Sequence, residues 1–338
     1  MLPLLQRCAK RTSPAPRAQV GPLCCALSPS GRAGGLKLRR VAVDSPTINR
    51  NPVTGNPTML NRSFTAFAVT WLLAACATPT EPMGPPRKEV LWAVTDGGEL
   101  IRFNAGQPQK VLERKAVQGV PAGERFVGID YRVAKGVLYG VTSGGRLMTL
   151  DTASGKATAV GNAAPATLSG AKFGVDFNPV ADRVRVVSDS GMNLRLHPDT
   201  GAVAATDPAL QYAAGDTRAG QPAAVTAAGY TYNKTNDKLT TNYAIDIKAG
   251  TLVTQGSKEG TDPAVSPNTG QLRTVGSLGV SGIEDASLDL SDLNNTAFAA
   301  LKTAGTTRLY LVDLASGKAT LVGTVAAGGG LLGMAIEP

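Results

Sequence analysis

Two stretches decide the fold: LYGVTSGGRLMTLDTASGKATAVG at residues 138–161 and AFAALKTAGTTRLYLVDLASGKATLVG at residues 297–323. Each contains two short apolar segments joined by a glycine-containing turn, then an Asp followed four positions later by Gly, and finally a third apolar segment. Short apolar or alternating segments bounded by turn residues predict β-strands. The two stretches are therefore copies of one unit made of strands.

The unit recurs five times between residue 91 and the C-terminus. The copies open at Leu91, Leu138, Val184, Leu239 and Ala297. A short apolar segment precedes each of the last four openings and another ends the chain, and the residues at the centres of these segments are Asp130, Asp176, Thr231, Asp289 and Ala335. Each full copy thus predicts four strands, and no stretch shows sustained helical periodicity.

Four short strands in each copy of about 50 residues are typical of a β-propeller blade. We predict an all-β fold with five four-stranded blades over residues 91–338, and an irregular or six-bladed propeller is the alternative. The first copy lacks its leading strand, and LLGMAIEP at residues 331–338 is a leading strand without a blade. This C-terminal strand is expected to close the first blade, which removes exposed sheet edges.

The positive charge of the chain is confined to its first part. The formal net charge is +9, but residues 1–58 hold nine Lys or Arg and one acidic residue, whereas the chain from Cys76 onward holds 24 of each sign. Nucleic-acid binding usually requires a basic face on the folded domain. The neutral repeat region argues against a nucleic-acid partner.

The segment MLNRSFTAFAVTWLLAAC at residues 59–76 resembles a bacterial lipoprotein signal peptide. It has a basic start, an apolar run of about a dozen residues that is too short to span a bilayer, and small residues before a cysteine. The resemblance implies removal of residues 59–75, lipidation of Cys76 and, because Ala77 follows, sorting to the outer membrane. The alternative is a buried strand with an incidental cysteine.

The segments on either side of this signal have biased compositions. Residues 1–58 are rich in Pro, Arg, Ser and Gly and fit an over-extended gene start or a disordered basic segment, with an organelle transit peptide as the alternative. Residues 76–90 contain four prolines and are expected to form a tether. At about 3.1 Å per residue such a tether would reach about 40 Å.

The residues that are missing exclude several chemistries. No cysteine follows Cys76, which excludes thiol nucleophiles, disulfides and cysteine-bound metals from the repeat region. The only histidine, His197, occupies the turn position held elsewhere by Asp151, Asp246 and Asp313, so we expect it to cap a turn rather than to act in catalysis. No phosphate-binding loop or dinucleotide fingerprint is present.

Two groups of residues are candidates for a site. Asp130, Asp176 and Asp289 hold equivalent positions on the expected innermost strands, where their carboxylates could hold a hard cation such as calcium. The alternative is that each carboxylate accepts backbone N–H groups within its own blade.

The second group consists of Arg183, Arg185 and Arg195 in the third copy. Arg185 fills a position that is aromatic in three other copies, and a guanidinium there could bind an anionic ligand. Alternatively, Arg185 pairs with Asp182, Asp189 or a neighbouring blade. The polar run at residues 233–243 of the fourth copy suits hydroxyl-rich ligands or forms a solvated hairpin.

The segment GVDFNPVADRVRVVSDSGMNLRLHPDTG at residues 174–201, with GIEDASLDL and the copy at residue 138, resembles the bacterial domain of unknown function 4394. The resemblance covers residues 90–338 and implies a repeat-built β fold and export. It carries no established activity or site.

These observations favour a non-enzymatic binding or scaffold module in the bacterial cell envelope, anchored to the outer membrane and facing the periplasm or the cell surface. Its partner would be an envelope protein or polymer. The alternative is a metal-dependent hydrolase or lyase that acts at the propeller axis through the three Asp residues. The sequence assigns no catalytic residue.

Overall fold

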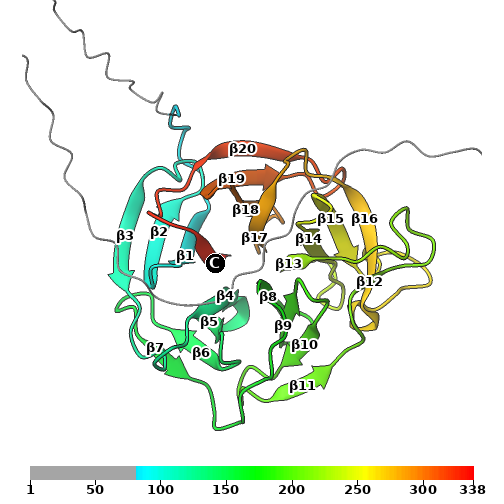
Figure 1. Cartoon of the computed structure of the whole chain (residues 1–338), viewed down its shortest axis with the longest axis horizontal. Helices are drawn as coiled ribbons and strands as arrows, with labels where there is room; N and C mark the ends of the chain where they lie inside the picture. Colours follow the sequence, from blue (N-terminus) through cyan, green and yellow to red (C-terminus); the bar gives the residue numbers. More distant parts are fainter. Residues whose placement is uncertain (1–80) are drawn as a thin grey trace, which may run out of the picture. The chain divides into compact units, whose positions relative to one another are not determined.

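The structure is a computed structural model and describes residues 81–338. These residues form five sheets arranged around an axis as a β-propeller (Figure 1). Each sheet contains four antiparallel strands, which follow one another from the axis to the rim. One sheet has an additional short strand. The predicted fold class and blade number are confirmed.

Blade 1 joins the two ends of the described chain. From the axis outward it contains β21 (Leu331–Ile336), β1 (Val90–Thr95), β2 (Glu99–Asn104) and β3 (Val111–Ala116). β21 pairs with β1 in an antiparallel register that places Leu91 opposite Ile336. The predicted closure of the first blade by the C-terminal strand is therefore confirmed.

The other blades follow in chain order, each with its innermost strand first. Blade 2 contains β4 (Phe126–Arg132), β5 (Val137–Thr142), β6 (Leu147–Leu150) and β7 (Ala157–Ala159), with a 3-10 turn η1 (Val133–Lys135) after β4. Blade 3 contains β8 (Phe173–Asn178), β9 (Arg183–Ser188), β10 (Asn193–Leu196) and β11 (Val203–Thr206). Blade 5 contains β17 (Ile283–Leu290), β18 (Ala297–Thr303), β19 (Thr306–Val312) and β20 (Ala319–Thr324).

Blade 4 departs from the regular pattern. It contains β13 (Val225–Tyr230), β14 (Asn242–Asp246), β15 (Thr251–Gln255) and β16 (Gln271–Ser277), with η2 (Pro267–Thr269) before β16. The two-residue strand β12 (Gln211–Tyr212) pairs in parallel with β16. The predicted opening of the fourth copy at Leu239 is wrong, because residues 231–241 form a long connection and the strand begins at Asn242.

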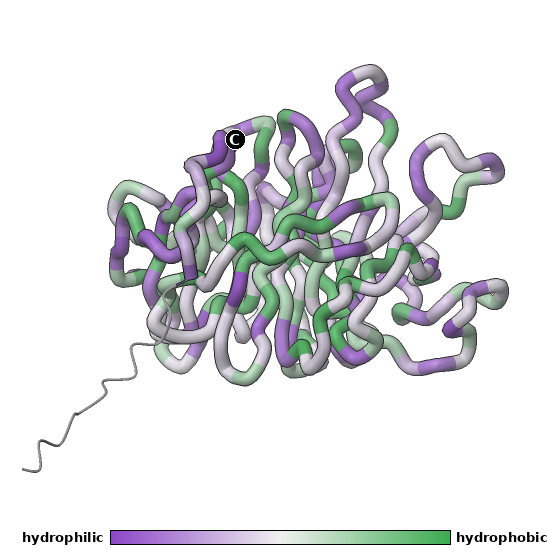
Figure 2. Tube along the Cα trace, turned by 90° about the horizontal axis from the view of Figure 1, so that it is seen from above, coloured by the Kyte–Doolittle hydropathy of each residue, from purple (hydrophilic) through white to green (hydrophobic). Residues whose placement is uncertain are grey.

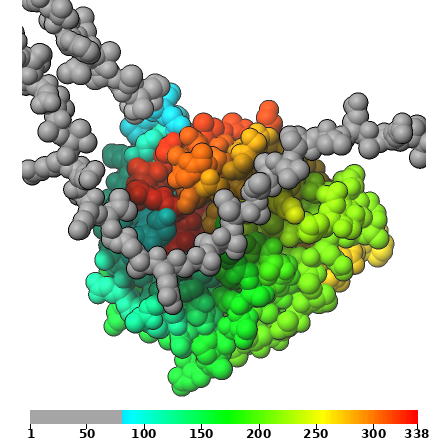
Figure 3. All heavy atoms as spheres, in the orientation of Figure 1, coloured from blue at the N-terminus to red at the C-terminus, as the bar shows by residue number. Residues whose placement is uncertain are grey.

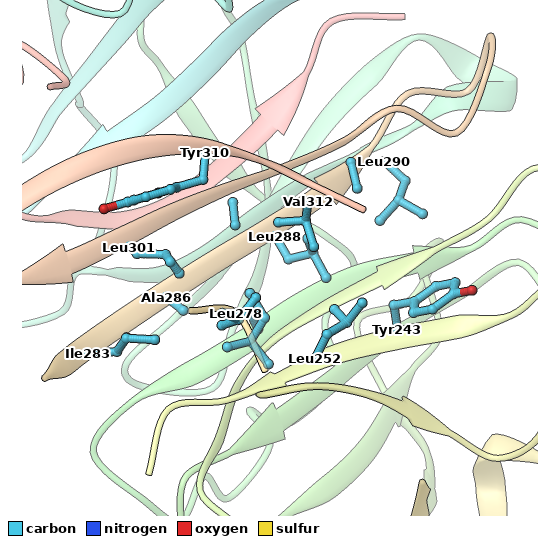
Figure 4. Packing of buried hydrophobic residues seen from close by; sticks show 14 residues of the cluster. Tyr243, Leu252, Leu278, Ile283, Ala286, Leu288, Leu290, Leu301, Tyr310 and Val312 are labelled. Atoms are coloured by element: carbon cyan, nitrogen blue, oxygen red, sulfur yellow. The ribbon is translucent and has the colours of Figure 1, made fainter. Parts of the chain in front are cut away.

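Apolar residues fill the space between neighbouring blades. The cluster between blades 4 and 5 contains Leu252 of blade 4 and Leu288 and Leu301 of blade 5 (Figure 4). Figure 2 shows hydrophobic stretches through the body of the propeller and hydrophilic stretches in the loops that project from it. Burial of such apolar surface is the main favourable contribution to folding.

The innermost strands approach each other closely at the axis. A Cβ atom on Gly128 would lie 2.4 Å from Val175 Cγ2, and a Cβ on Gly174 would lie 2.7 Å from the backbone of Ala227. Only glycine allows backbones to pack this closely. The axial cavity that these residues line has a volume of about 10 Å³, enough for a single water molecule.

The predicted turn role of His197 is confirmed. Its Nδ1 accepts the backbone N–H of Asp199 at 3.2 Å, as Asp151 and Asp313 accept the N–H two residues later in their own turns. The histidine is therefore a variant of a repeated turn residue.

Cys76 and the rest of the signal-like segment lie outside the described residues. Within residues 81–338 no helix has the length and apolar character needed to cross a membrane.

Candidate functional site

The structure brings Asp130, Asp176 and Asp289 together at the axis. One carboxylate oxygen from each lies within 4.8 Å of the others, and all three residues are buried. They lie on β4, β8 and β17, which are the innermost strands of their blades. Each Asp is near the C-terminal end of its strand. The repeat positions identified in the sequence therefore form one acidic cluster.

Each carboxylate of this cluster accepts an N–H group from the next blade. Asp130 Oδ2 accepts the N–H of Phe177 at 2.7 Å, Asp176 Oδ1 accepts that of Tyr230 at 3.1 Å, and Asp289 Oδ2 accepts that of Ile336 at 2.6 Å. The alternative considered from the sequence, in which each carboxylate accepts N–H groups only within its own blade, therefore accounts for only part of these hydrogen bonds. The carboxylates link blade 2 to 3, blade 3 to 4, and blade 5 to 1.

The remaining two blades have no carboxylate at this position. Ala335 pairs with Trp92 as Asp130 pairs with Tyr139, so Ala335 holds the equivalent position in blade 1. In blade 4 the equivalent residue is Gly229, which pairs with Tyr243. The assignment of Thr231 to this ring is wrong, because Thr231 lies beyond β13.

Burial changes the protonation of the cluster. Desolvation raises the pKa of Asp130 and Asp176 well above the usual range, and repulsion between the carboxylates raises both further. Desolvation also raises the pKa of Asp289 to about 7, although two backbone N–H groups oppose this shift. At neutral pH the cluster therefore retains protons that an exposed Asp would have lost.

The cluster fits a calcium ion only in part. The oxygen separations of up to 4.8 Å are compatible with Ca–O distances of about 2.3–2.6 Å to a shared ion. However, calcium takes about six to eight oxygen ligands, and Gly229 and Ala335 contribute no side-chain oxygen at the other two positions. Asp289 in addition uses both of its oxygens for backbone N–H groups.

Arg185 is buried in a network between blades 3 and 4. Its guanidinium donates to Tyr230 Oη at 2.6 Å and to Asn268 Oδ1 at 2.6 Å in blade 4, and to Asn193 Oδ1 at 2.5 Å. A contact of 3.2 Å with Asp207 neutralises its charge. The expected pairing with a neighbouring blade accounts for this residue, and a ligand in solution would not reach it.

The other two arginines of the third copy are more accessible. Arg195 donates Nε and Nη2 to Asp207, both at 2.8 Å, and lies at a groove between blades 3 and 4. Arg183 donates to the backbone oxygen of Asp182 at 2.7 Å. Arg185 and Arg195 are thus cross-strand partners that share Asp207, whereas Arg183 donates elsewhere, so the three arginines do not form one open anion site.

The groove beside Arg195 has a volume of about 600 Å³. Its lining combines the basic residues Lys238 and Lys258 with the apolar Val180 and Leu239. Polar groups line much of the remainder, namely Asn178, Thr240, Ser257, Thr261, Ser266 and Asn268. A groove of this size with mixed lining matches ordinary ligand sites.

Two lengthened loops of blade 4 form the outer wall of this groove. The first connection of the blade spans residues 231–241, whereas its counterparts in blades 2 and 3 span 133–136 and 179–182. The third connection spans residues 256–270, compared with 151–156 in blade 2. Both follow strands that run in the same direction, so both loops emerge at the end of the propeller where the acidic cluster lies.

The two loops are held to each other by hydrogen bonds. Asn233 Nδ2 donates to Glu259 Oε2 at 3.0 Å, and the N–H of Glu259 donates to Thr241 Oγ1 at 2.9 Å. Asn233 Oδ1 also accepts two backbone N–H groups of its own turn. Much of the polar run at residues 233–243 therefore shapes the loops rather than facing a ligand.

Arg132 is a further residue with a role that sequence reasoning did not identify. It is buried at the end of β4 and donates to Asp182 at 2.8 and 2.5 Å and to Asp199 at 2.5 Å, which links blade 2 to the loops of blade 3. No local pattern marks it, because its partners lie far away in the sequence.

Comparison with known proteins identifies the family. Residues 99–335 match the family described as Domain of unknown function (DUF4394). The chain belongs to the DUF4394 family. This match spans all five blades, so the family and the propeller coincide. No curated protein matches this DUF4394 chain.

Solved structures similar to this DUF4394 protein are distant. Glutaminyl cyclase from Myxococcus xanthus is 14% identical, with a TM-score of 0.40 over 64% of this chain and 84% of that one. A structural genomics protein of unknown function from Bacteroides thetaiotaomicron is 13% identical, with a TM-score of 0.42 over 68% of this chain and 56% of that one. Similarity at this level transfers no activity.

Proposed function

We propose that the protein is an exported, lipid-anchored binding module of the bacterial cell envelope, which binds an envelope polymer in the groove between blades 3 and 4. The observation that carries this proposal is the pair of lengthened blade 4 loops that enclose the groove. Binding residues on propellers and other rigid scaffolds commonly lie on such loops.

The lining of the groove favours a polymer that carries both hydroxyl and acidic groups. Lys238 is exposed and supplies positive charge to the wall, whereas the Lys258 ammonium lies 5.7 Å from the centre of the Tyr243 ring and 3.4 Å from the backbone oxygen of Leu314 in blade 5. Glu259 is engaged by Asn233, and Asp207 is engaged by two arginines. The Asn, Ser and Thr side chains of the lining suit hydroxyl groups.

A binding role has more support than catalysis at the axis. The three carboxylates are buried and accept N–H groups of neighbouring blades, and none of them lines the axial cavity, which itself admits no molecule larger than water. A hydrolase or lyase would need its substrate in contact with these groups. The groove, by contrast, is open to solvent and large enough for a ligand.

Co-sedimentation with purified peptidoglycan sacculi tests the proposal, with membrane-extracted polysaccharide as a second polymer. We expect the pair of substitutions Lys238→Glu and Lys258→Glu to weaken binding about tenfold, which corresponds to about 1.4 kcal/mol. Lys156→Glu, an exposed substitution on blade 2, serves as the matched control and should leave binding unchanged.

A photo-crosslinking residue at position 239 distinguishes a protein partner from a polymer. Leu239 in the groove is 38% exposed, and Val203 on β11 is 43% exposed and provides a similarly accessible control outside the groove. A discrete protein adduct at position 239 alone would replace the polymer with a protein partner. Failure of both polymers to sediment the protein, together with no adduct at position 239, would refute the groove as a binding site.

A further inference from the structure

The chain that leads into blade 1 is attached to the rim of the propeller from Glu81 onward. Glu81 Oε2 accepts the N–H of Thr324 at 2.7 Å, and Glu81 Oε1 lies 3.7 Å from Nε of Arg308. Both partners belong to the outer strands of blade 5. The beginning of the described chain is therefore fixed to blade 5 rather than to blade 1 alone.

The residues that follow are fixed to blade 1. Gln107 donates to the backbone oxygen of Gly84 at 3.0 Å, and Arg87 and Asn104 exchange two hydrogen bonds of 2.8 Å. Pro85 packs so closely that a Cβ on Gly106 would lie 2.0 Å from its oxygen. Residues 81–89 are thus attached to the propeller, and only residues 76–80 of the predicted tether lie outside the described residues.

The short distance in sequence between Glu81 and Cys76 limits how far the propeller can lie from a lipid anchor. Glu81 follows Cys76 by five positions. A fully extended chain of this length spans at most about 18 Å. If Cys76 carries lipid, as the proposed function requires, the rim around Glu81 lies within this distance of the bilayer.

The same rim exposes large apolar residues. Met83, Leu112 and Leu321 are 54%, 45% and 49% exposed, and they lie respectively on the attached segment, on β3 and on β20. Lys110 is exposed two positions before Leu112, and Lys88 is exposed five positions after Met83. The acidic residues of this rim are paired, Glu81 with Arg308 and Glu113 with Arg102 and Lys115. Apolar side chains among basic ones are suited to a surface of anionic phospholipid.

We infer that the outer rim of blades 1 and 5 rests on the bilayer surface, so that the propeller stands on its edge and the groove between blades 3 and 4 faces away from the membrane. In a ring of five blades, the boundary between blades 3 and 4 lies across from blade 1. Figure 3 shows the cyan residues that begin the described chain on one side of the ring and the yellow-green residues of blade 4 on another. This orientation rests on the proposed lipid anchor.

Fluorescence quenching of the lipidated protein in vesicles tests this orientation. Because no cysteine follows Cys76, one introduced cysteine gives a single labelling site in the processed protein. The full chain would be produced in bacteria with Leu112→Cys or Leu321→Cys, and with Val203→Cys or Leu239→Cys as controls on blades 3 and 4. Each labelled protein is placed in vesicles of phosphatidylethanolamine and phosphatidylglycerol that contain a lipid with a nitroxide on its headgroup.

We expect loss of emission at positions 112 and 321 and none at positions 203 and 239. Equal quenching at all four positions, absence of quenching at all four, or stronger quenching at positions 203 and 239 would overturn the orientation. Mass spectrometry of the N-terminal peptide shows whether Cys76 carries lipid, and so separates a wrong orientation from the absence of the lipid anchor. An N-terminus without lipid would overturn both the anchor and the orientation, whereas lipidated Cys76 with equal quenching would overturn the orientation alone.

A second variant tests the role of the short connection. Insertion of about 20 Gly and Ser residues between Thr80 and Glu81 adds a flexible span with a root-mean-square length of about 25 Å. The quenching difference between positions 112 and 239 should then disappear while lipidation persists. An unchanged difference would show that the connection does not set the orientation.

Discussion

Protonation of the axial cluster predicts that the propeller loses stability as pH rises. Asp289 has a pKa of about 7 in the folded protein, compared with 3.8 for an ordinary Asp. Between these values the folded state keeps a proton that the unfolded chain has released, so the free energy of unfolding falls as pH increases. A shift of about three pH units corresponds to a loss of about 4 kcal/mol. Asp130 and Asp176 act in the same direction.

Urea unfolding of residues 77–338 at a series of pH values between 4.5 and 8 measures this loss. For a domain of this size, the same change should lower the melting temperature by about 10 °C. The variant Asp289→Asn, which cannot ionise, should have a smaller slope of stability against pH, even if loss of one backbone acceptor lowers its absolute stability. Asp151→Asn, in an exposed turn, serves as the control and should leave the slope unchanged.

Two outcomes would refute the reasoning. Stability that is constant or increases between pH 5 and 8 would show that the buried carboxylates do not hold protons in the folded state. A slope that is the same in the parent protein and in Asp289→Asn would assign the pH dependence to other groups. Asp285 is the first of these to test, because desolvation raises its pKa to about 6.

Three further predictions concern the axis and the links between blades. Because the cluster supplies few ligands, we expect the melting temperature at pH 8 to be the same with calcium and with a chelator. Bound calcium at about 100 times its Kd would add about 2.7 kcal/mol to the free energy of unfolding. An increase of about 5–10 °C in the melting temperature would therefore restore the cation hypothesis. Gly174→Ala places a Cβ 2.7 Å from the backbone of Ala227 and should destabilise the fold by about 1–3 kcal/mol in urea unfolding, whereas Gly215→Ala, with open space around it, should change stability by less than about 0.5 kcal/mol. Arg185→Met leaves Tyr230, Asn193 and Asn268 without their shared donor, while Arg195 still pairs with Asp207, and it should lower the unfolding free energy by about 2–4 kcal/mol. A loss below about 1 kcal/mol would show that the network contributes little.

The repeat allows most of the architecture to be predicted. Strand-length apolar segments at regular spacing are local signals, and the unpaired leading strand at residues 331–338 indicates the closure of blade 1. Equivalent positions in the repeat also predict that Asp130, Asp176 and Asp289 converge at the axis. The direction of their hydrogen bonds is not predictable from the repeat, because it depends on how neighbouring blades are rotated against each other.

The fourth copy shows where the repeat is insufficient. GYTY at residues 229–232 resembles the other leading segments, and this resemblance predicts Thr231 at the ring position. The register of β13 and β14 instead places Gly229 there, since the long connection at residues 231–241 begins directly after Tyr230. The extra length of this copy is visible in the sequence, but its position between the strands and the groove it creates follow only from tertiary packing.

Closure of blade 1 also affects the order in which the protein can fold. β1 belongs to the first strands of the propeller to leave the ribosome, and its inner partner β21 is formed by residues 331–336, near the end of the chain. Until those residues are available, the ring is open and β1 has an unpaired inner edge. Completion of the ring therefore requires residues 331–336, which are made after all the other strands of the propeller. The same dependence means that deletion of residues 331–338 would leave the inner edge of β1 free to pair with an exposed strand of another copy.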